Sequence, residues 1–257
     1  MDLGLSGLRA LVTGASRGLG FATAQALAAE GARVALNSRS VDKLRVAADR
    51  LGGVAVAADI TESGAAERVV AETVESLGGL DILITNAGGP PSGAFESFDD
   101  AAWEKALDLS LMSHVRLIRA ALPHLRRSQA AAVLTITSYS VKQPIPNLVL
   151  SNSIRAATVG LTKTLALELG KDGIRFNSIL PGWTETERVT ELMTFRAGQN
   201  GTTVDEEIRK QMAESPFGRM ARPEEFAKPA VFLVSPAASY ITGVMLTVDG
   251  GMVKGTL

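Results

Sequence analysis

Short apolar runs alternate with longer helical patterns along almost the whole chain, and this alternation constrains the fold more than any other feature. Seven runs are nearly continuous in apolar residues, over residues 8–12, 33–36, 54–57, 80–84, 131–137, 174–179 and 246–248. Strands buried on both faces have this character, whereas strands with one solvated face alternate apolar and polar residues. The sequence therefore predicts an α/β fold, a doubly wound parallel sheet of about seven strands with helices on both faces.

The predicted helices lie between these runs, over residues 21–30, 41–51, 62–77, 99–127 and 150–169. The interval 99–127 is interpreted as one long helical stretch. No linker-like or low-complexity segment interrupts the series, so a single domain is predicted over residues 1–257. Residues 182–223 depart from the pattern because they are polar and charged, and we expect a lid-like insertion at about 184–223.

The composition excludes several kinds of site. The chain has no cysteine, which removes disulfides, thiolate nucleophiles and cysteine-ligated metals. Its two histidines, His114 and His124, stand ten residues apart on a predicted helix and so do not share a face. We expect surface or interface positions for both, and no metal site is predicted.

The charge balance and hydropathy also limit the partners. With 26 basic and 27 acidic residues, the chain has no net field to attract nucleic acid or an anionic membrane. No apolar run approaches the ~20 residues that span a bilayer. The first residues lack the basic flank of a secretory signal, so a cytoplasmic protein is expected.

A glycine-rich loop follows the first predicted strand, over residues 13–20, and a helix follows it at once. Its glycines have the spacing G-x-x-x-G-x-G. At such a junction the backbone can approach a pyrophosphate, which the free N–H groups and the dipole of the helix N-terminus bind. A turn with only a packing role is the alternative, and the strand–loop–helix context favours a nucleotide.

Two arginines refine the choice of nucleotide. The second strand ends near Arg39 with no acidic residue, although NAD-binding sites usually carry one there for the ribose 2′-hydroxyl. Arg17, in the glycine loop, and Arg39 are placed to flank a 2′-phosphate, for which guanidinium groups are well suited. Either arginine alone would be interpreted as a surface residue; together they favour NADP(H) over NAD(H).

With these motifs in order, the chain resembles the short-chain dehydrogenase/reductase family over nearly its whole length, and most closely the β-ketoacyl-(acyl-carrier-protein) reductase type. The resemblance implies a Rossmann-like domain, commonly a homotetramer, that exchanges a hydride between a nicotinamide cofactor and a small carbonyl or alcohol substrate. The matching segments are 13–20, Asp59-Ile60, Asn86-Ala87-Gly88, Ser138, Pro181-Gly182 with Thr186, 240–243 and 248–251.

Carried over position by position, the family pattern places Asp59 at the adenine, Asn86 to Gly88 beside the adenosine ribose and residues 181–186 along the nicotinamide. The predicted cofactor contacts are Gly14, Ser16, Arg17, Gly18, Leu19, Gly20, Arg39, Asp59, Ile60, Asn86, Ala87, Gly88, Pro181, Gly182, Thr184 and Thr186.

The catalytic positions of the family are only partly retained. Its chemistry rests on an Asn, a Ser, a Tyr and a Lys, the last two spaced Tyr-x-x-x-Lys on one helix. In this chain Ser138 keeps the serine position, whereas Ser110, Ser151 and Arg155 stand at the asparagine, tyrosine and lysine positions. A serine hydroxyl is a much weaker acid than a phenol, and loss of a positioned general acid costs roughly 10²- to 10⁴-fold in rate.

Tyr139, directly after Ser138, is a candidate replacement for the missing acid; a packing role for Tyr139 is the alternative. Arg155 is expected to hold a ribose or an anionic group of the substrate, and Leu192, Met193 and Phe195 to form an apolar wall of the lid. Two functions remain open: an NADP(H)-dependent oxidoreductase with an atypical active site, or a catalytically impaired or inactive NADP(H)-binding sensor or scaffold of the same fold.

Overall fold

A seven-stranded parallel sheet lies at the centre of the computed structural model, which describes residues 1–256. Its strand order is β3-β2-β1-β4-β5-β6-β7, and every neighbouring pair is parallel. The strands are β1 (Arg9–Val12), β2 (Arg33–Ser38), β3 (Val54–Ala57), β4 (Ile82–Thr85), β5 (Ala132–Ile136), β6 (Arg175–Pro181) and β7 (Met245–Val248). The predicted fold class is confirmed.

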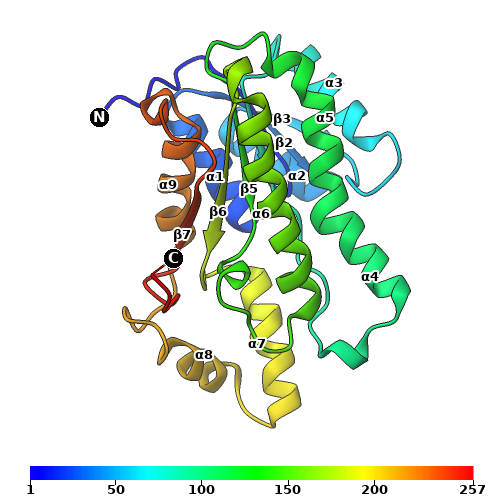
Figure 1. Ribbon diagram of the computed structural model, residues 1–257, viewed down its shortest axis with the longest axis vertical. Helices are drawn as coiled ribbons and strands as arrows, with labels where there is room; N and C mark the ends of the chain where they lie inside the picture. Colours follow the sequence, from blue (N-terminus) through cyan, green and yellow to red (C-terminus); the bar gives the residue numbers. More distant parts are fainter. Residues whose placement is uncertain (257) are drawn as a thin grey trace.

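Helices cover both faces of this sheet (Figure 1). Alternate residues along each central strand enter two separate cores: in β1, Ala10 and Val12 belong to one and Leu11 to the other. The first core is closed by α1 (Gly18–Ala29), α2 (Val41–Leu51) and α9 (Pro223–Val234). The second is closed by α3 (Ala65–Leu77), α5 (Ser113–Leu125) and α6 (Val149–Leu169). Burial on both faces explains why the strands are continuously apolar.

The strand order reverses between β1 and β4. From β1 the chain builds outward to β2 and β3, and then returns to place β4 on the other side of β1. The loops that leave β1 and β4 therefore diverge, and such a switch point opens a crevice at the carboxyl edge of the sheet. The glycine loop after β1 and Asn86 after β4 border this crevice.

The predicted long helical stretch over residues 99–127 is continuous over residues 100–125 in the structure, but it is not α-helical throughout. It consists of α4 (Asp100–Leu107), a π-helical segment (Asp108–Met112) and α5. A hydroxyl from the neighbouring helix binds this segment, because Thr158 Oγ1 of α6 donates to the Ser110 carbonyl over 2.6 Å. Short π-helical segments often occur at functional sites, and this one contains Ser110.

Residues 184–223 lie beyond the carboxyl edge of the sheet, where α7 (Glu187–Asn200) and α8 (Val204–Met212) stand below the strands in Figure 1. The two ends of this segment meet, because Ala221 N–H donates to the Trp183 carbonyl and Glu185 N–H to the Ala221 carbonyl, each over 2.9 Å. Within residues 1–256, every helix is too short or too polar to cross a lipid bilayer.

Candidate active site

The glycine loop is held tightly against the strand ends around it. The Ala15 N–H donates to the Asn37 carbonyl at the end of β2 over 2.9 Å, and the Asn86 side chain donates from Nδ2 to the Gly14 carbonyl over 3.1 Å. The Thr13 side chain adds two hydrogen bonds: its Oγ1 donates to the Asn86 carbonyl over 2.8 Å and accepts from the Asn86 N–H over 2.9 Å. The loop is therefore preorganised by the two strands that flank the crevice.

The geometry of this loop requires glycine at two positions. Gly14 has a φ of +58°, and a Cβ there would lie 2.7 Å from Asn86 Nδ2. A Cβ on Gly20 would overlap the Gly14 carbonyl oxygen and lie 2.9 Å from Asn86 Nδ2. Neither position accepts a side chain without displacing the loop, and α1 begins at once, at Gly18. The result is a bare backbone cradle at a helix N-terminus, which suits an anionic pyrophosphate.

The two arginines considered for a 2′-phosphate each contact a carboxylate. Arg39 Nη1 lies 3.6 Å from Asp59 Oδ2, and Arg17 Nη2 lies 3.2 Å from Glu191 Oε1 of α7. Although partial burial alone would raise the pKa of Asp59, hydrogen bonds from Thr61 and the charge of Arg39 lower it below its usual value. Asp59 is therefore ionised at neutral pH and holds Arg39 at the mouth of the crevice.

The remaining predicted cofactor contacts line the same edge of the sheet. Ile60 and Ala87 are buried, Ser16 and Leu19 are half-buried, and Gly88 is exposed. Pro181 ends β6, Gly182 follows it, and Thr184 is buried. Thr186 is the N-cap residue of α7, and its side chain accepts a hydrogen bond from the Val189 N–H. These residues are contributed by the loop and helix start after β1, by the loops after β3 and β4, and by the end of β6 with the loop that follows it.

Ser138 follows β5 and is half-buried. Its Oγ accepts a hydrogen bond from the Ser140 N–H over 3.1 Å. Because this bond uses a lone pair, the hydroxyl proton remains available for donation. Ser151 is half-buried in the first turn of α6, one helical turn before Arg155, so the two side chains share a helix face.

Ser110 is buried, with 1% of its surface exposed, and its Oγ has no hydrogen-bond partner among the described residues. The same holds for Thr137 Oγ1, just before Ser138, and for Ser140 Oγ after it. Buried polar atoms are almost always partnered, by protein or by ordered water. Three buried hydroxyls, in the π-helical segment and around the end of β5, have no protein partner among the described residues.

Arg155 is 7% exposed and directs its guanidinium at backbone carbonyls. Nη1 donates to Ile136 over 3.2 Å and to Thr137 over 3.1 Å, and Nη2 reaches the Gly88 carbonyl at 3.5 Å. Burial, and to a smaller extent the charge of Arg188, lowers the pKa of Arg155 to about 10, so it remains charged at neutral pH. A permanent cation thus joins the carboxyl ends of β4 and β5.

Tyr139 lies in a small apolar cluster under the lid-like segment. Its hydroxyl accepts a hydrogen bond from Trp183 Nε1 over 3.0 Å, and Met193 and Leu192 belong to the same cluster. Burial raises the pKa of Tyr139 above its usual value, with the Trp183 hydrogen bond acting in the opposite sense. Tyr139 is therefore protonated at neutral pH and a weaker acid than a solvated tyrosine.

His114 is buried, with 1% of its surface exposed, so the prediction of a surface or interface position was wrong for this residue. Its Nδ1 lies 2.6 Å from Thr85 Oγ1 at the end of β4, and its Nε2 is unpartnered within residues 1–256. Burial, then the nearby Arg155 charge, lowers the pKa of His114 to about 3 and keeps it neutral. The helical spacing from His114 to the buried Leu117 and Ala121 was the signal that would have placed it inside.

Two cavities border this region. One, of about 330 Å³, lies beside Tyr139 between the loop after β5 and the helices α7 and α8. Leu192 and Phe195 line it, whereas Met193 is fully buried in the adjoining cluster. The other cavity, of about 1060 Å³, opens between α1, α7, α8 and the start of α9.

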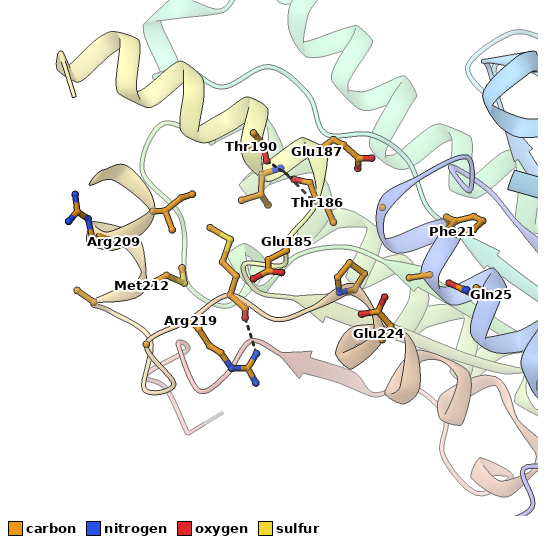
Figure 2. A pocket seen from close by; sticks show the side chains of 18 of the residues that line it. Phe21, Gln25, Glu185, Thr186, Glu187, Thr190, Arg209, Met212, Arg219 and Glu224 are labelled. Atoms are coloured by element: carbon orange, nitrogen blue, oxygen red, sulfur yellow. Dashed lines mark hydrogen bonds between the residues drawn. The ribbon is translucent and has the colours of Figure 1, made fainter. Parts of the chain in front are cut away.

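Figure 2 shows this larger cavity. Phe21 and Gln25 line it from α1, and Met212 from α8. Gly18 and Thr186 also line it, and a Cβ on Gly18 would lie 3.7 Å from Thr186 Cγ2, so the two segments nearly touch. The residues that line this cavity therefore include part of the glycine loop but not the group formed by Ser138, Ser151 and Arg155.

Comparison with known proteins agrees with this geometry. The family model described as Enoyl-(Acyl carrier protein) reductase matches residues 14–253. The chain is 33% identical to the 3-oxoacyl-(acyl-carrier-protein) reductase FabG of Vibrio cholerae over 97% of this chain and 99% of that protein. It is 32% identical to the 7alpha-hydroxysteroid dehydrogenase of Escherichia coli, over 98% of this chain and 97% of that one.

Among solved structures, L-sorbose reductase from Gluconobacter frateurii, complexed with NADPH and L-sorbose, superposes with a TM-score of 0.93 at 35% identity. The match covers 99% of this chain and 100% of the sorbose reductase chain. The nearly complete coverage in sequence and in structure shows that the chain belongs to the short-chain dehydrogenase/reductase family of oxidoreductases.

Proposed function

We propose that the chain is an NADP(H)-dependent oxidoreductase that transfers a hydride between the cofactor and a carbonyl or alcohol substrate through an atypical active site. The observation that carries the proposal is the glycine loop, locked by Asn86 and lacking room for a side chain at Gly14 and Gly20. Its fit to a pyrophosphate is supported by solved relatives that hold NADPH.

The choice of NADP(H) rests on Arg17 and Arg39. Both arginines pair with carboxylates at the surface, and exposed ion pairs of this kind contribute little to stability. The guanidinium groups are therefore free to exchange their carboxylates for a 2′-phosphate, which binds arginine bidentately. Asp59 and Ile60 would then lie at the adenine, Asn86 to Gly88 at the adenosine ribose, and residues 181–186 at the nicotinamide.

The bound cofactor would supply or accept the hydride, and the protein residues would bind the substrate and move the proton. Ser138 would donate a hydrogen bond to the substrate oxygen and keep its proton, because its Oγ already accepts the Ser140 N–H and its own O–H is free to donate. Arg155 would hold a positive charge beneath the site. Either Ser151 or Tyr139 would complete the proton path, since the Tyr139 hydroxyl accepts from Trp183 and keeps its own proton.

The substrate would enter from the cavity beside Tyr139 and lie under the segment 184–223, which we propose acts as a lid. Leu192 and Phe195 give this cavity an apolar side. Gln143, Gln199 and Gln211 give it amides that can hydrogen-bond oxygen atoms of a substrate.

A second candidate function is an inactive NADP(H)-binding sensor or scaffold. It is favoured by one observation: α6 contains no tyrosine, and the nearby Tyr139 is held in an apolar cluster, where burial raises its pKa. With serine at the expected acid position, the cofactor would bind without efficient turnover.

The test is to titrate the purified protein with NADPH by fluorescence and then assay it with a panel of ketones and β-ketoacyl thioesters. Tight NADPH binding with turnover supports the proposal. Tight binding without any turnover would favour the sensor or scaffold, and no NADPH binding would refute both.

The double variant Ser151→Tyr/Arg155→Lys separates the two candidates further. A gain of roughly 10²- to 10⁴-fold in reductase activity, from a phenol that is a much better acid than serine, would mean that the pocket is otherwise competent and that the native chain has given up this chemistry, which favours the sensor or scaffold. Activity of the parent that the double variant does not exceed would favour the oxidoreductase with an atypical active site. Ser153→Tyr is the matched control, because Ser153 is exposed two residues further along α6 and points away from the site. A gain with both variants would contradict the assignment of Ser151 to the acid position.

A further inference from the structure

Two guanidinium groups converge on the loop that follows β4. Arg155 of α6 reaches the Gly88 carbonyl, and Arg188 Nη2 at the start of α7 donates to the Pro90 carbonyl over 2.9 Å. Between these two contacts lies Gly89, where a Cβ would stand 3.1 Å from Arg188 Nη2. One cation comes from the core of the site and the other from the segment that covers it.

Arg155 makes no ion pair with any carboxylate among residues 1–256, and its hydrogen-bond partners there are carbonyl oxygens. A buried charge without a counterion is strongly unfavourable, and such charges are normally paired. The charge of Arg188 adds to this cost, because it disfavours the charged form of Arg155.

The positive charge of Arg188 is not fully neutralised by a carboxylate either. Its nearest carboxylate is Glu191, at 3.9 Å, and the same carboxylate lies closer to Arg17, at 3.2 Å. Arg17 and Arg188 therefore share one exposed carboxylate and Arg155 contacts none, while His114 near Arg155 is held neutral by burial. The region has an excess of positive charge that an anionic ligand would balance.

The position of this charge indicates which part of a ligand would bind it. Arg155 Nη1 donates to the carbonyl of Thr137, the residue immediately before Ser138, and its Nε–H has no acceptor among the described residues. An anion bound there lies close to the group that Ser138 binds. A carboxylate separated by few bonds from the reacting carbonyl meets this requirement, and arginine forms its strongest hydrogen bonds with carboxylates.

We propose that Arg155 and Arg188 form a carboxylate-binding subsite, and that the substrate is a small 2- or 3-oxo acid or the corresponding hydroxy acid. This inference rests on the proposed function and narrows it. In the reducing direction the carbonyl carbon receives the hydride from NADPH and the oxygen receives a proton, which gives the hydroxy acid and NADP⁺.

The experiment compares acids with neutral analogues of the same shape. The full-length protein is assayed with NADPH and with 2-oxobutanoate, 3-oxobutanoate, their methyl esters and a 3-oxobutanoyl thioester. We expect kcat/KM for one of the acids to exceed that for its ester by about 10- to 100-fold, the value of one charge-assisted hydrogen bond or two.

Arg188→Gln tests the subsite without disturbing the core, because half of the Arg188 side chain is exposed. The variant should lower kcat/KM for the acid about tenfold, through a higher KM, and leave kcat/KM for the ester unchanged. Arg119→Gln, at an exposed position of α5 outside both cavities, is the matched control and should change the kinetics of neither substrate. Calorimetric titration of the NADP⁺ complex with 3-hydroxybutanoate measures carboxylate binding independently of turnover, and Arg188→Gln should weaken it.

Three results would overturn the inference. Equal kcat/KM for acid and ester, or a preference for the thioester, would exclude a carboxylate-binding subsite and leave the proposed oxidoreductase function intact. Weaker NADPH binding in Arg188→Gln, with acid and ester affected equally, would assign the charge to the cofactor phosphates. Absence of turnover with every substrate would refute the proposed function itself, and 3-hydroxybutanoate titration would then still show whether the anion site exists.

Discussion

The substitution Gly20→Ala should damage nucleotide binding more than any other exchange that adds a single methyl group to the loop. Its Cβ would overlap the Gly14 carbonyl oxygen and lie 2.9 Å from both the Gly14 carbonyl carbon and Asn86 Nδ2. The neighbours are backbone and a hydrogen-bonded amide, so they cannot move aside independently. Either the loop shifts away from α1, or the bond from Asn86 to Gly14 breaks.

The cost follows from these two contacts. Inserting a methyl group into a well-packed site typically costs about 1–3 kcal/mol, and a lost hydrogen bond adds about 1 kcal/mol. The sum, about 2–4 kcal/mol, corresponds to an NADPH Kd weakened by about 30- to 700-fold if all of it is expressed in the loop conformation that binds the cofactor. Any part expressed instead in the unliganded fold would appear as a lower Tm.

Fluorescence titration with NADPH and thermal unfolding of the same preparations measure both parts. Gly198→Ala is the matched control, because this helical glycine of α7 has no atom within 4 Å of an added Cβ and should become slightly more stable. A Gly20→Ala protein with Kd within twofold of the parent and an unchanged Tm would refute the reasoning.

Three further predictions concern buried polar groups. Asp81 accepts hydrogen bonds from the Arg9 side chain. Burial alone would raise the pKa of Asp81, but these hydrogen bonds lower it below its usual value. The contribution of Asp81 to the free energy of unfolding is therefore present above about pH 4 and is lost as the pH falls below that. Asp81→Asn should cost about 3–5 kcal/mol at pH 7, measured by urea unfolding, and an equal loss at pH 2 would contradict the linkage. The pKa of His114 is lowered to about 3, so below about pH 6.5 the unfolded state takes up a proton that the folded state refuses, and stability falls with a slope of up to about 1.4 kcal/mol per pH unit. His114→Gln should remove this slope between pH 6 and pH 4 in the same unfolding assay, and a persistent slope would show that another group causes it. Thr158→Val deletes the hydrogen bond to the Ser110 carbonyl and should destabilise the fold by about 1–3 kcal/mol in thermal unfolding, whereas an unchanged Tm would show that water replaces it.

The strands and most helices were predictable because their positions depend on the local pattern of apolar and polar residues. A strand buried on both faces must be apolar throughout, and the predicted and observed strand ends differ by only one or two residues. The π-helical segment over 108–112 was not predictable, because apolar spacing continues through it and the hydroxyl that binds it, that of Thr158, belongs to another element.

Side-chain environments were harder to predict than backbone elements. The sequence placed Arg155 on the same helix face as Ser151, but its contacts with the ends of β4 and β5 depend on how three elements meet. His114 was misplaced because a polar residue within a helix is usually exposed, and here Thr85 of another strand supplies its partner. The position of Tyr139 under Trp183 depends on the path of the segment after β6, which has no periodic signal.

The π-helical segment also has a consequence for how this region can tolerate changes in length. A π-helical turn amounts to one residue inserted into an α-helix. Removing one residue from 108–112 would restore a continuous α-helix, because four α-helical residues turn the chain through nearly the same angle as five residues of the wider π-helical turn. Ala106 would therefore keep its place against Leu150 and Ile154. A single deletion here should be tolerated better than a deletion within α4 or α5, where each removed residue rotates the flanking helix by roughly 100°.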